Sequence, residues 1–299
     1  MTLTDIMNSK LSEYIDIIEN NLKHYTEDKI KSTPQKILGE AMMYSLSAGG
    51  KRIRPVLVME FCRVCGGDIE KAVAAACGLE MIHTFSLIHD DLPAMDDDDF
   101  RRGRPSCHKA YPESIAILAG DALAILPFQI IAEDAANDAE TKLKLICDLS
   151  RSSGMYGMTG GQVIDIENET RETVSEDNLR YMYSLKTGEL IKTACRMGCI
   201  AAGADEKTIS RAQQYAEKLG LAFQIIDDIL DVTSTTEELG KPVGSDSQQN
   251  KTTFVTLMGV EKARQEADRI TSEALEILDD FDDNEFLKEL TRELLCRKK

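Results

Sequence analysis

The spacing of apolar residues constrains the fold of this chain more than any other feature. Apolar side chains recur at i, i+3, i+4 and i+7 along almost the whole sequence, and the alternation typical of strands is nearly absent. Hydrophobic residues make up 42% of the 299 positions, which is enough for a sizeable core. Since no internal repeat or composition break marks a linker, the sequence predicts one all-α domain, residues 1–299, with about ten helices around a central cavity.

The helix boundaries follow from this periodicity and from capping residues. Thr33-Pro34 predicts a helix start with proline at the first helical position, and Asp68 and Ser175 are expected N-caps. The segment 233–253, rich in Gly, Ser and Thr, is either an ordinary connector or a lid. The helices are expected over residues 4–25, 34–46, 55–65, 68–91, 109–137, 139–154, 157–167, 176–202, 206–232, 252–280 and 284–297.

The composition argues against several classes of protein. A formal net charge of −17 disfavours a general nucleic-acid or anionic-membrane surface. The cysteines lack the flanking ligands of a zinc site and are expected to be reduced thiols. The most apolar stretch, 115–132, is interrupted by polar residues and a proline, so a buried helix explains it better than a membrane span. Because the N-terminus is charged and amphipathic, with no signal peptide, the expected location is the cytosol.

Two groups of aspartates carry the clearest chemical signal. Asp90-Asp91 end one apolar run and are followed by aspartates at 96–99, while Asp227-Asp228 and Asp231 end another. Carboxylates this close repel one another, and anions are disfavoured at a helix C-terminus, so a cation should offset the arrangement. Magnesium suits oxygen-rich sites and bridges a few carboxylates to substrate phosphates. The two groups therefore predict a diphosphate clamp.

The spacing within each group supports this prediction. Asp227 and Asp231 are i, i+4 and share a helix face. Asp90 and Asp96 would not align on a regular helix, but Pro93 removes a backbone hydrogen bond and kinks the chain between them. We expect the intervening turn to bulge outward and to bring Asp96 back beside Asp90.

Basic residues gather in three places of this otherwise acidic chain. One group runs from Lys51 to Arg54 after two glycines, and a second, Arg101-Arg102, follows the first aspartates directly. The third comprises the lysines at 186, 241 and 251. Arginine offers a forked set of donors and lysine a point charge, and both suit phosphate. Their placement favours diphosphate binding over solvated surface charge.

Six segments together resemble the trans-isoprenyl diphosphate synthases, and most closely the bacterial farnesyl diphosphate synthases (geranyltranstransferases). They occur in the family's order over about residues 36–255 and read SAGGKRIRP, IHTFSLIHDDLPAMDDDDFRRGRPSCH, LAGDAL, KTGEL, FQIIDDILD and LGKPVGSD. The resemblance implies the all-α isoprenoid synthase fold and a homodimer. It also implies a head-to-tail condensation of isopentenyl diphosphate with dimethylallyl diphosphate and then with geranyl diphosphate.

The resemblance also implies roles for individual residues. Three magnesium ions would be bound by Asp90, Asp96 and Asp227, with support from Asp91 and Asp231. The allylic diphosphate would be held by Arg101, Lys186 and Lys241. Isopentenyl diphosphate would be held by Lys51, Arg54, His83 and Arg102. Polar groups that face the developing cation match Thr187 and Gln224, and a lysine of the closing loop matches Lys251.

The expected mechanism is ionisation, condensation and elimination. Magnesium and cationic side chains stabilise the departing diphosphate, and the isopentenyl double bond attacks the allylic cation. A lid and an apolar cavity must exclude water, which would quench the cation. No general base with a tuned pKa is evident, and the family implies that the released diphosphate takes the proton.

Product length is expected to depend on Phe85. It lies five residues before Asp90, about 7–8 Å along a helix, and it is either a core aromatic or the wall that closes the elongation cavity. Ser86 beside it is small. In the family, an aromatic residue here together with the insertion Pro93-Ala94 goes with a fifteen-carbon product. His89 is expected to pack or to hydrogen-bond beside Asp90.

Several alternatives remain open at this point. A synthase of geranyl or geranylgeranyl diphosphate differs only in product length. A terpene cyclase would lack Lys51 and Arg54 and usually carries an Asn/Ser/Glu metal motif in place of DDILD. A noncatalytic subunit of a heteromeric synthase would be expected to have lost aspartates, and both groups are intact. A helical acidic cation-binding protein would bind magnesium without diphosphate.

Overall fold

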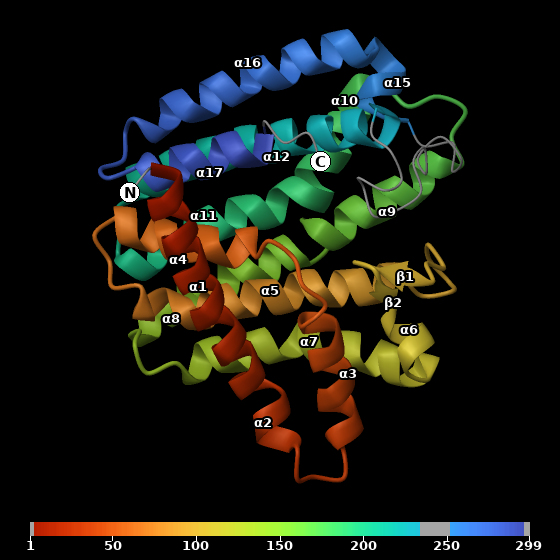
Figure 1. The fold of residues 1–299 in the computed structure, drawn as a ribbon, viewed down its shortest axis with the longest axis vertical. Helices are drawn as coiled ribbons and strands as arrows, with labels where there is room; N and C mark the ends of the chain where they lie inside the picture. Colours follow the sequence, from red (N-terminus) through yellow and green to blue (C-terminus); the bar gives the residue numbers. More distant parts are fainter. Residues whose placement is uncertain (1–2, 234–251, 296–299) are drawn as a thin grey trace.

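A computed structural model describes residues 3–233 and 252–295, and within these ranges the fold is almost wholly helical, as predicted (Figure 1). The only sheet in the described residues is a hairpin of β1 (Phe100–Arg101) and β2 (Arg104–Pro105). The helical elements are α1 (Leu3–Tyr25), α2 (Glu27–Ile30), α3 (Lys36–Leu46), α4 (Ile53–Val64), α5 (Glu70–Asp90), α6 (Cys107–Ala110), α7 (Glu113–Glu133), α8 (Ala139–Ser153), α9 (Met158–Glu169), α10 (Glu176–Tyr183), the π-helical segment η1 (Ser184–Gly188), α11 (Glu189–Ala202), α12 (Glu206–Thr233), α15 (Phe254–Met258), α16 (Val260–Leu278) and α17 (Glu285–Leu295).

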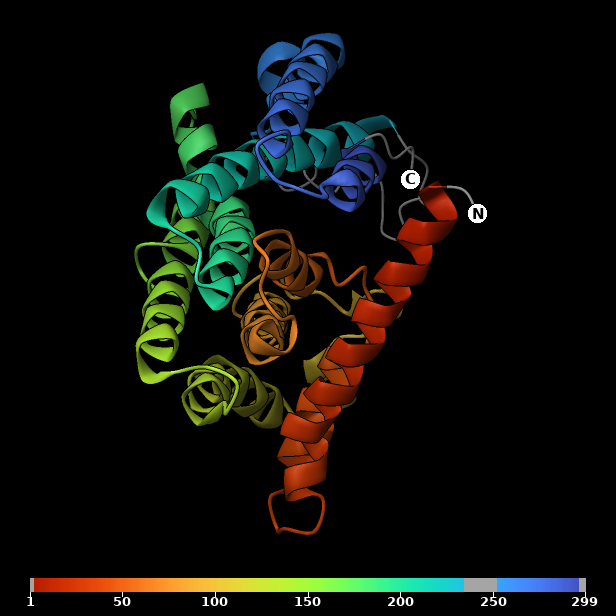
Figure 2. The same cartoon turned by 90° about the vertical axis from the view of Figure 1, so that its left-hand side faces the viewer.

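Helix α5 is the centre of this arrangement. It packs against α4, α7 and α11, and α12 packs on α11 and carries α16 and α17. Seen from the side in Figure 2, the two orange helices α4 and α5 lie inside a ring formed by the others. A helix surrounded on all sides needs apolar residues on every face, and most of α5 from Ala72 to Ile88 is buried. The fold thus brings Asp90, the last residue of α5, to one end of the bundle.

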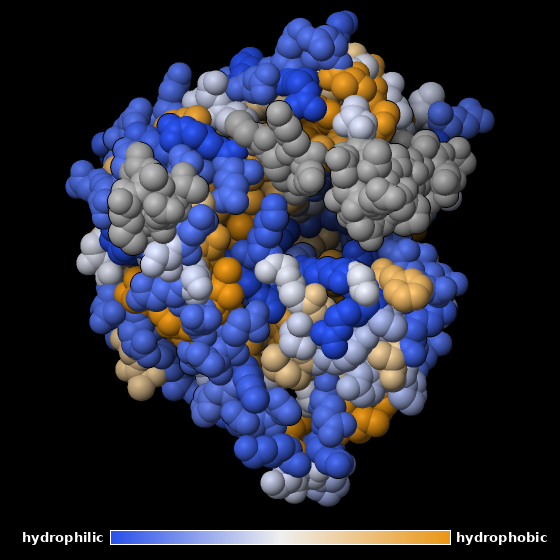
Figure 3. Space-filling view, in the orientation of Figure 1, coloured by the Kyte–Doolittle hydropathy of each residue, from blue (hydrophilic) through white to orange (hydrophobic). Residues whose placement is uncertain are grey.

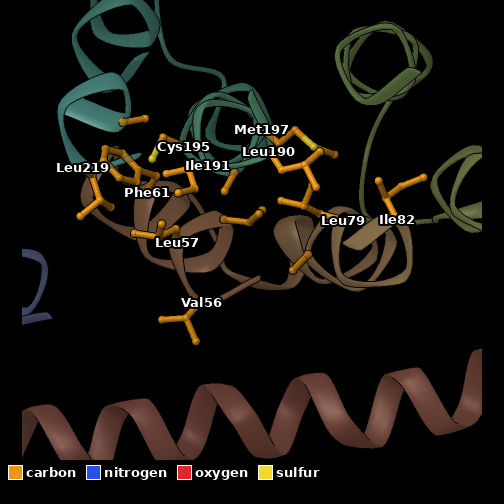
Figure 4. Packing of buried hydrophobic residues seen from close by; sticks show 14 of the residues in the cluster. Val56, Leu57, Phe61, Leu79, Ile82, Leu190, Ile191, Cys195, Met197 and Leu219 are labelled. Carbon is orange, nitrogen blue, oxygen red and sulfur yellow. The ribbon is translucent and has the colours of Figure 1, made fainter. Parts of the chain in front are cut away.

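The core forms where α4, α5 and α11 meet. Figure 4 shows Phe61 of α4 near Ile191 of α11, and Leu79 of α5 near Leu190 of α11. The helices α4 and α11 approach each other closely at Gly198, where a Cβ would lie 2.3 Å from the carbonyl oxygen of Val58. The cysteines of the described residues are free thiols, in agreement with the expectation.

Two helices have the length and composition to cross a membrane. They are α5 and α7, and 72% of the apolar window of α5 is buried inside the protein, whereas the figure for α7 is 39%. A buried core helix passes the same test of length and hydropathy, so α5 needs no bilayer. Helix α7 keeps exposed apolar side chains at Leu118 and Ile125. The absence of a membrane span stays a prediction.

Some predicted boundaries are wrong, each for a local reason. Pro34 does not open α3: it lies in a turn that Thr33 closes by donating its hydroxyl to the Ile30 carbonyl, 2.7 Å away, and the helix begins at Lys36. The helix expected over 109–137 is split because Pro112 separates α6 from α7. The helix expected over 252–280 is interrupted at Gly259, whose φ of +81° lies in the left-handed region.

The predicted capping residues agree with the structure better than the predicted boundaries do. Ser175 caps α10 by accepting a hydrogen bond from the Asn178 backbone N–H at 3.2 Å, as expected. Asp68 accepts from the Glu70 N–H at 3.1 Å and so serves the start of α5, although the helix begins two residues later than predicted. The single helix expected over 176–202 is continuous but contains the π-helical turn η1.

Candidate active site

A cavity of about 450 Å³ opens at the end of α5 that carries Asp90. One part of its lining is apolar, and the other part gathers acidic, basic and hydroxyl side chains. The lining residues are Arg54, His83, Phe85, Ser86, Leu87, His89, Asp90, Leu92, Ala94, Met95, Met158, Thr159, Gln162, Lys186, Thr187 and Leu190. Figure 3 shows a hollow near the middle of the face drawn there, with hydrophilic residues at its rim.

The turn after α5 doubles back as the sequence predicted. The backbone N–H of Asp96 donates to the Asp90 carbonyl oxygen at 2.9 Å, so the residues around Pro93 bulge outward. The charge of Asp96 acts on the Asp90 carboxylate. Burial raises the pKa of Asp90 to about 6; the negative charge of Asp96 adds to this rise, while the ammonium of Lys186 opposes it. Asp90 therefore faces both a like charge and a cation across the mouth of the cavity.

The remaining aspartates of this run have partners of their own. Asp99 forms an ion pair of 2.8 Å with Lys109 on α6, and Asp98 lies 3.4 Å from Arg101. Asp91 is buried, and its Oδ1 accepts a hydrogen bond from Arg101 Nε at 3.0 Å. Asp91 and Arg101 thus form an ion pair with each other, and neither lines the large cavity. This pair fixes the arginine close enough to Asp90 for its charge to act on that carboxylate.

The second acidic group lies on the last turns of α12. Asp228 is buried and accepts a hydrogen bond from the Tyr183 hydroxyl at 2.9 Å and another from the Phe254 backbone N–H at 2.8 Å. Asp231 is buried as well. Asp227 lies close enough to act electrostatically on Arg54. Gln224, one turn earlier, is half-buried and does not line the large cavity.

The described parts of the chain contain no group of three or more His, Cys, Asp and Glu side chains placed to hold a metal ion. The two acidic groups therefore do not form a ready-made cage. Asp90 and Asp96 remain next to each other through their backbone hydrogen bond.

Cations from two separate segments meet at the rim. Arg54 Nη1 lies 3.4 Å from His83 Nε2, and Arg102 donates to the Gly49 carbonyl oxygen while its guanidinium covers Gly50. Gly50 has a φ of +125°, and a Cβ there would lie 2.7 Å from the Arg102 guanidinium, so both the turn and the contact require glycine. Arg54, His83 and Arg102, predicted to bind one diphosphate, are thus brought together.

The electrostatics of this group suit an anion. Burial lowers the pKa of Arg54, and burial together with the charge of Arg54 lowers the pKa of His83 well below its usual value. His83 is therefore neutral at physiological pH. The buried Nε of Arg54 has no hydrogen-bond partner in the described structure, which is typical of a group that awaits a ligand. Lys51 is exposed beside them.

Arg52 is a residue whose role the sequence did not reveal. It has a left-handed φ of +49° and is buried, with ion pairs of 2.6 Å to both Glu19 of α1 and Glu80 of α5. It holds the turn that precedes α4 and so positions Arg54. Arg52 is therefore engaged in ion pairs within the fold, whereas Arg54 lines the cavity.

The π-helical segment η1 presents Lys186 and Thr187 to the cavity. Lys186 Nζ lies 2.5 Å from an oxygen of Asp165, a buried carboxylate on α9 that the sequence analysis missed. Three glycines let this segment approach its neighbours. A Cβ on Gly161 would lie 2.3 Å from the Lys186 backbone nitrogen, and one on Gly220 would lie 3.2 Å from the Cα of Gly188. The backbone of η1 is thus held between α9 and α12.

The polar face of α9 also went unnoticed in the sequence. Thr159 and Gln162 line the cavity, and Asp165 holds Lys186. The spacing of Gln162 and Asp165, i and i+3 on a predicted helix, was the signal that could have identified them.

Phe85 and Ser86 of α5 both line the cavity. The ring of Phe85 stands edge-to-face against the imidazole of His89, with 5.8 Å between centroids. His89 donates from Nε2 to the Ile117 carbonyl oxygen of α7 at 3.1 Å, which confirms the expectation that it packs and hydrogen-bonds beside Asp90. Phe85 and His89 form a continuous wall.

The predicted lid residues Lys241 and Lys251 lie outside the described residues.

Comparison with known proteins identifies the family. A family model described as polyprenyl synthetase matches residues 35–294. The chain belongs to the polyprenyl synthetase family.

Two curated relatives of this polyprenyl synthetase differ in name. A geranylgeranyl diphosphate synthase of Cyanophora paradoxa is 45% identical over 265 residues, which cover 87% of this chain and 88% of that protein. A dimethylallyltranstransferase of Fischerella ambigua is 42% identical over 274 residues, 91% of this chain and 79% of the relative.

Solved structures of similar proteins share the fold. A FPP/GFPP synthase from Zymomonas mobilis superposes with a TM-score of 0.85 at 34% identity, over 98% of both chains. A geranylgeranyl pyrophosphate synthetase from Pyrococcus horikoshii superposes with a TM-score of 0.89 at 27% identity, over 99% of both chains. The all-α isoprenoid synthase fold expected from the sequence is therefore confirmed.

The donors at the mouth of the cavity fit the divalent metal on which this family depends. Magnesium is usually held by one or two carboxylates, several waters and the substrate's phosphates, so it needs no cage of three side chains. Asp90 and Asp96 supply two adjacent carboxylates, and burial together with the like charge of Asp96 raises the pKa of Asp90. The donor set is thus suited to a metal that arrives together with a diphosphate.

Proposed function

We propose that this polyprenyl synthetase condenses isopentenyl diphosphate with dimethylallyl diphosphate and then with geranyl diphosphate, to give farnesyl diphosphate. One observation carries the proposal: a single cavity joins the Asp90 carboxylate and the Lys186 ammonium at its mouth to an apolar wall that ends at Phe85. This combination suits a substrate with a diphosphate head and a hydrocarbon tail. A helical cation-binding protein would need only the carboxylates.

The allylic substrate would bind with its diphosphate at the mouth. Lys186, held by Asp165 at 2.5 Å, would supply a point charge to that group, and Arg101, held by Asp91, would stand at its edge. Up to three magnesium ions would be held by Asp90, Asp96 and Asp227, with Asp91 and Asp231 in support. When bound, magnesium neutralises the charge that develops on the departing diphosphate.

Isopentenyl diphosphate would bind to the cations on the other side of the rim. Arg54, Arg102 and Lys51 would hold its phosphates, and the buried, unpartnered Nε of Arg54 would gain an acceptor there. The allylic carbon–oxygen bond breaks with its electron pair leaving on the diphosphate, and the isopentenyl double bond forms the new carbon–carbon bond. Loss of one proton completes the product.

The proton would go to the released diphosphate. His83 is close to this site, but the same burial and positive charge that lower its pKa make it a weak base. Thr187 would turn its hydroxyl toward the developing cation, and Gln224 its amide. The apolar lining, from Leu92 to Met158, would exclude the water that would otherwise capture the cation.

A synthase of geranylgeranyl diphosphate is the second candidate. The name of the Cyanophora paradoxa relative supports it, whereas the aromatic wall of Phe85 and His89 supports the shorter product. Incubation with radiolabelled isopentenyl diphosphate and each allylic primer, with and without magnesium, tests the proposal. We expect magnesium-dependent incorporation with farnesyl diphosphate as the main product. No incorporation with any primer would refute prenyl transfer, and a twenty-carbon main product would favour the second candidate.

Replacement of Phe85 tests the wall directly. In Phe85→Ala the product distribution should shift toward twenty carbons, because the cavity gains the volume of the ring. Phe85→Tyr, which keeps the ring, is the matched control and should retain the wild-type distribution. Chromatography of the dephosphorylated products measures both. An unchanged distribution in Phe85→Ala would reject the role of this residue.

We also propose a homodimer, formed through the exposed apolar face of α7. Leu118 is 52% and Ile125 68% exposed on this face, and Leu143 of α8 is 61% exposed. Exposed apolar side chains on one helix face, here Leu118 and Ile125, favour association. Sedimentation of the wild type should give a dimer, and Ile125→Lys should give a monomer. A monomeric wild type at micromolar concentration would refute the dimer.

A further inference from the structure

The wall that Phe85 forms continues along α5 to His89, which contacts α7. The imidazole of His89 lies between the ring of Phe85, 5.8 Å away between centroids, and the backbone of α7. Its Nε2 donates to the Ile117 carbonyl oxygen at 3.1 Å and lies 3.8 Å from a carboxylate oxygen of Asp121. The ring is thus fixed on one side by a hydrogen bond and on the other by an aromatic contact.

Gly120 makes this position possible. A Cβ on this glycine would lie 2.1 Å from Nε2 of His89 and 2.4 Å from its Cδ2, far inside van der Waals contact. The imidazole therefore occupies the space that any other residue at position 120 would fill. Gly120 is buried and helical, so its value here is the absence of a side chain rather than backbone freedom.

From this geometry we infer that the contact between His89 and Gly120 sets the depth of the cavity, and so helps to select the length of the prenyl chain. The inference rests on the proposed function. His89 lines the cavity and is a specificity-determining residue, whereas Gly120 acts through His89 and is a positioning residue.

Substitutions at His89 and at Gly120 should change the depth of the cavity in opposite directions. His89→Ala removes the support of Phe85 and opens space toward α7, so the cavity deepens. Gly120→Ala adds a methyl group that must displace the imidazole by well over an ångström, toward Phe85 and the lumen, so the cavity becomes shallower. A nonspecific loosening of the packing would not produce opposite shifts.

Product distributions provide the main test. Relative to wild type, His89→Ala should raise the ratio of each longer product to the next shorter one by about tenfold, because a single methylene in an apolar pocket already changes discrimination by about 10–200-fold. Gly120→Ala should lower the same ratio. In the double variant the methyl group meets no imidazole, so the effect of Gly120→Ala should disappear, which is a strong coupling between the two sites.

The matched control is Gly78→Ala. Gly78 lies in the same interface between α5 and α7, where a Cβ would meet Pro127 at 3.2 Å, but it does not line the cavity. This variant should keep the wild-type distribution. A shift of the product distribution in Gly78→Ala like that in Gly120→Ala would overturn the inference, because any disturbance of the interface between α5 and α7 would then be enough to change product length. An unchanged distribution in His89→Ala would overturn it as well.

A binding measurement separates this inference from the proposed function. Calorimetric titration with the non-hydrolysable thiolo analogues of geranyl and geranylgeranyl diphosphate gives a ratio of dissociation constants for each variant, and circular dichroism melting verifies folding. In His89→Ala the longer analogue should gain about tenfold over the shorter one. If wild type bound both analogues but formed no product, the proposed function would fail, and the ratio would still decide whether the contact sets cavity depth. Equal ratios in wild type, His89→Ala and Gly120→Ala would refute the inference alone.

Discussion

The acidic end of α5 and the acidic end of α12 look alike in sequence but differ in structure. At the end of α5, the turn through Pro93 brings Asp96 back to Asp90, and the Asp90 side chain lines the cavity. Near the end of α12 the chain remains helical, and Asp228 is bound to Tyr183 and to the backbone of Phe254. The aspartates at the end of α5 therefore place negative charge beside the cavity. In the group on α12, by contrast, the Asp228 carboxylate joins helices.

The difference shows that a run of aspartates contains residues of more than one kind. Burial raises the pKa of Asp90, whose neighbours include a like charge, so it is suited to binding a cation. Asp228 has two hydrogen-bond donors and holds α10 and α15 against α12. Asp227, its neighbour in sequence, lies close enough to Arg54 for its charge to act on the guanidinium. Adjacent residues on one helix thus have separate tasks.

Among substitutions that test this comparison, the largest effect, on kcat/KM, is expected at Asp90. Asp90→Ala should lower kcat/KM by about a thousandfold, because loss of one electrostatic group aimed at the reacting charge costs about 10²–10³. The thermal midpoint should stay the same or rise, since a buried, crowded carboxylate is removed. Asp97→Ala is the control, because that side chain is exposed, and it should retain activity within about threefold, as surface ion pairs contribute little. A large loss of stability in Asp90→Ala would contradict the assignment.

Next in size is a paired comparison on α12. Asp228→Ala should lower the free energy of unfolding by about 3 kcal/mol, because two buried donors lose a charged acceptor. Asp227→Ala should leave stability within about 1 kcal/mol of wild type, the range of most half-exposed substitutions, and should lower kcat/KM by about a hundredfold. Urea unfolding and steady-state assays measure the two quantities. If both variants lost stability equally, the division of labour between neighbouring aspartates would be wrong.

The smallest expected effect is a pH dependence of the free energy of unfolding of the metal-free protein. The folded state raises the pKa of Asp90 from 3.8 to about 6, so it binds the proton more tightly than the unfolded chain does. The stabilisation is fully present below about pH 4 and is lost as the pH rises through about 6, with a total of about 2–3 kcal/mol. Asp90→Asn should lack this dependence. Magnesium affinity should change in the opposite sense and increase with pH over the same range, because the metal requires the carboxylate. Urea unfolding at several pH values, compared with Asp90→Asn, tests the sign.

Much of the fold was predictable because it follows from periodicity. The 3.6-residue pattern identified nearly every long helix, and Ser175 identified a cap. The turn at Pro93 was predictable from a single backbone rule, the missing N–H of proline. The division at Pro112 and Gly259 was not, because each local breaker competed with a continuous apolar pattern on both sides.

Less of the site was predictable, because contacts between distant segments decide which charged side chains are engaged in ion pairs within the fold and which face the cavity. Arg52 and Arg54 are two residues apart, yet Glu19 and Glu80 engage the first and leave the second at the cavity. Asp165 has no neighbour in sequence that reveals its ion pair with Lys186. Nothing in the local sequence indicated that His89 would fill the space above Gly120. Such pairings depend on how α1, α5, α7 and α9 pack.

The π-helical turn at Ser184–Gly188 makes the number of residues in this stretch matter as much as their identity. A π-helical turn contains one residue more than an α-helical turn, so removal of a single residue here would let an α-helical turn replace it, and the residues that now bulge would change position. Lys186 would then point away from Asp165, while the glycines that receive this backbone would face side chains instead. The loss of one residue, harmless in an exposed coil, would here separate the Lys186 charge from the cavity, so this turn should not lose its extra residue without loss of activity.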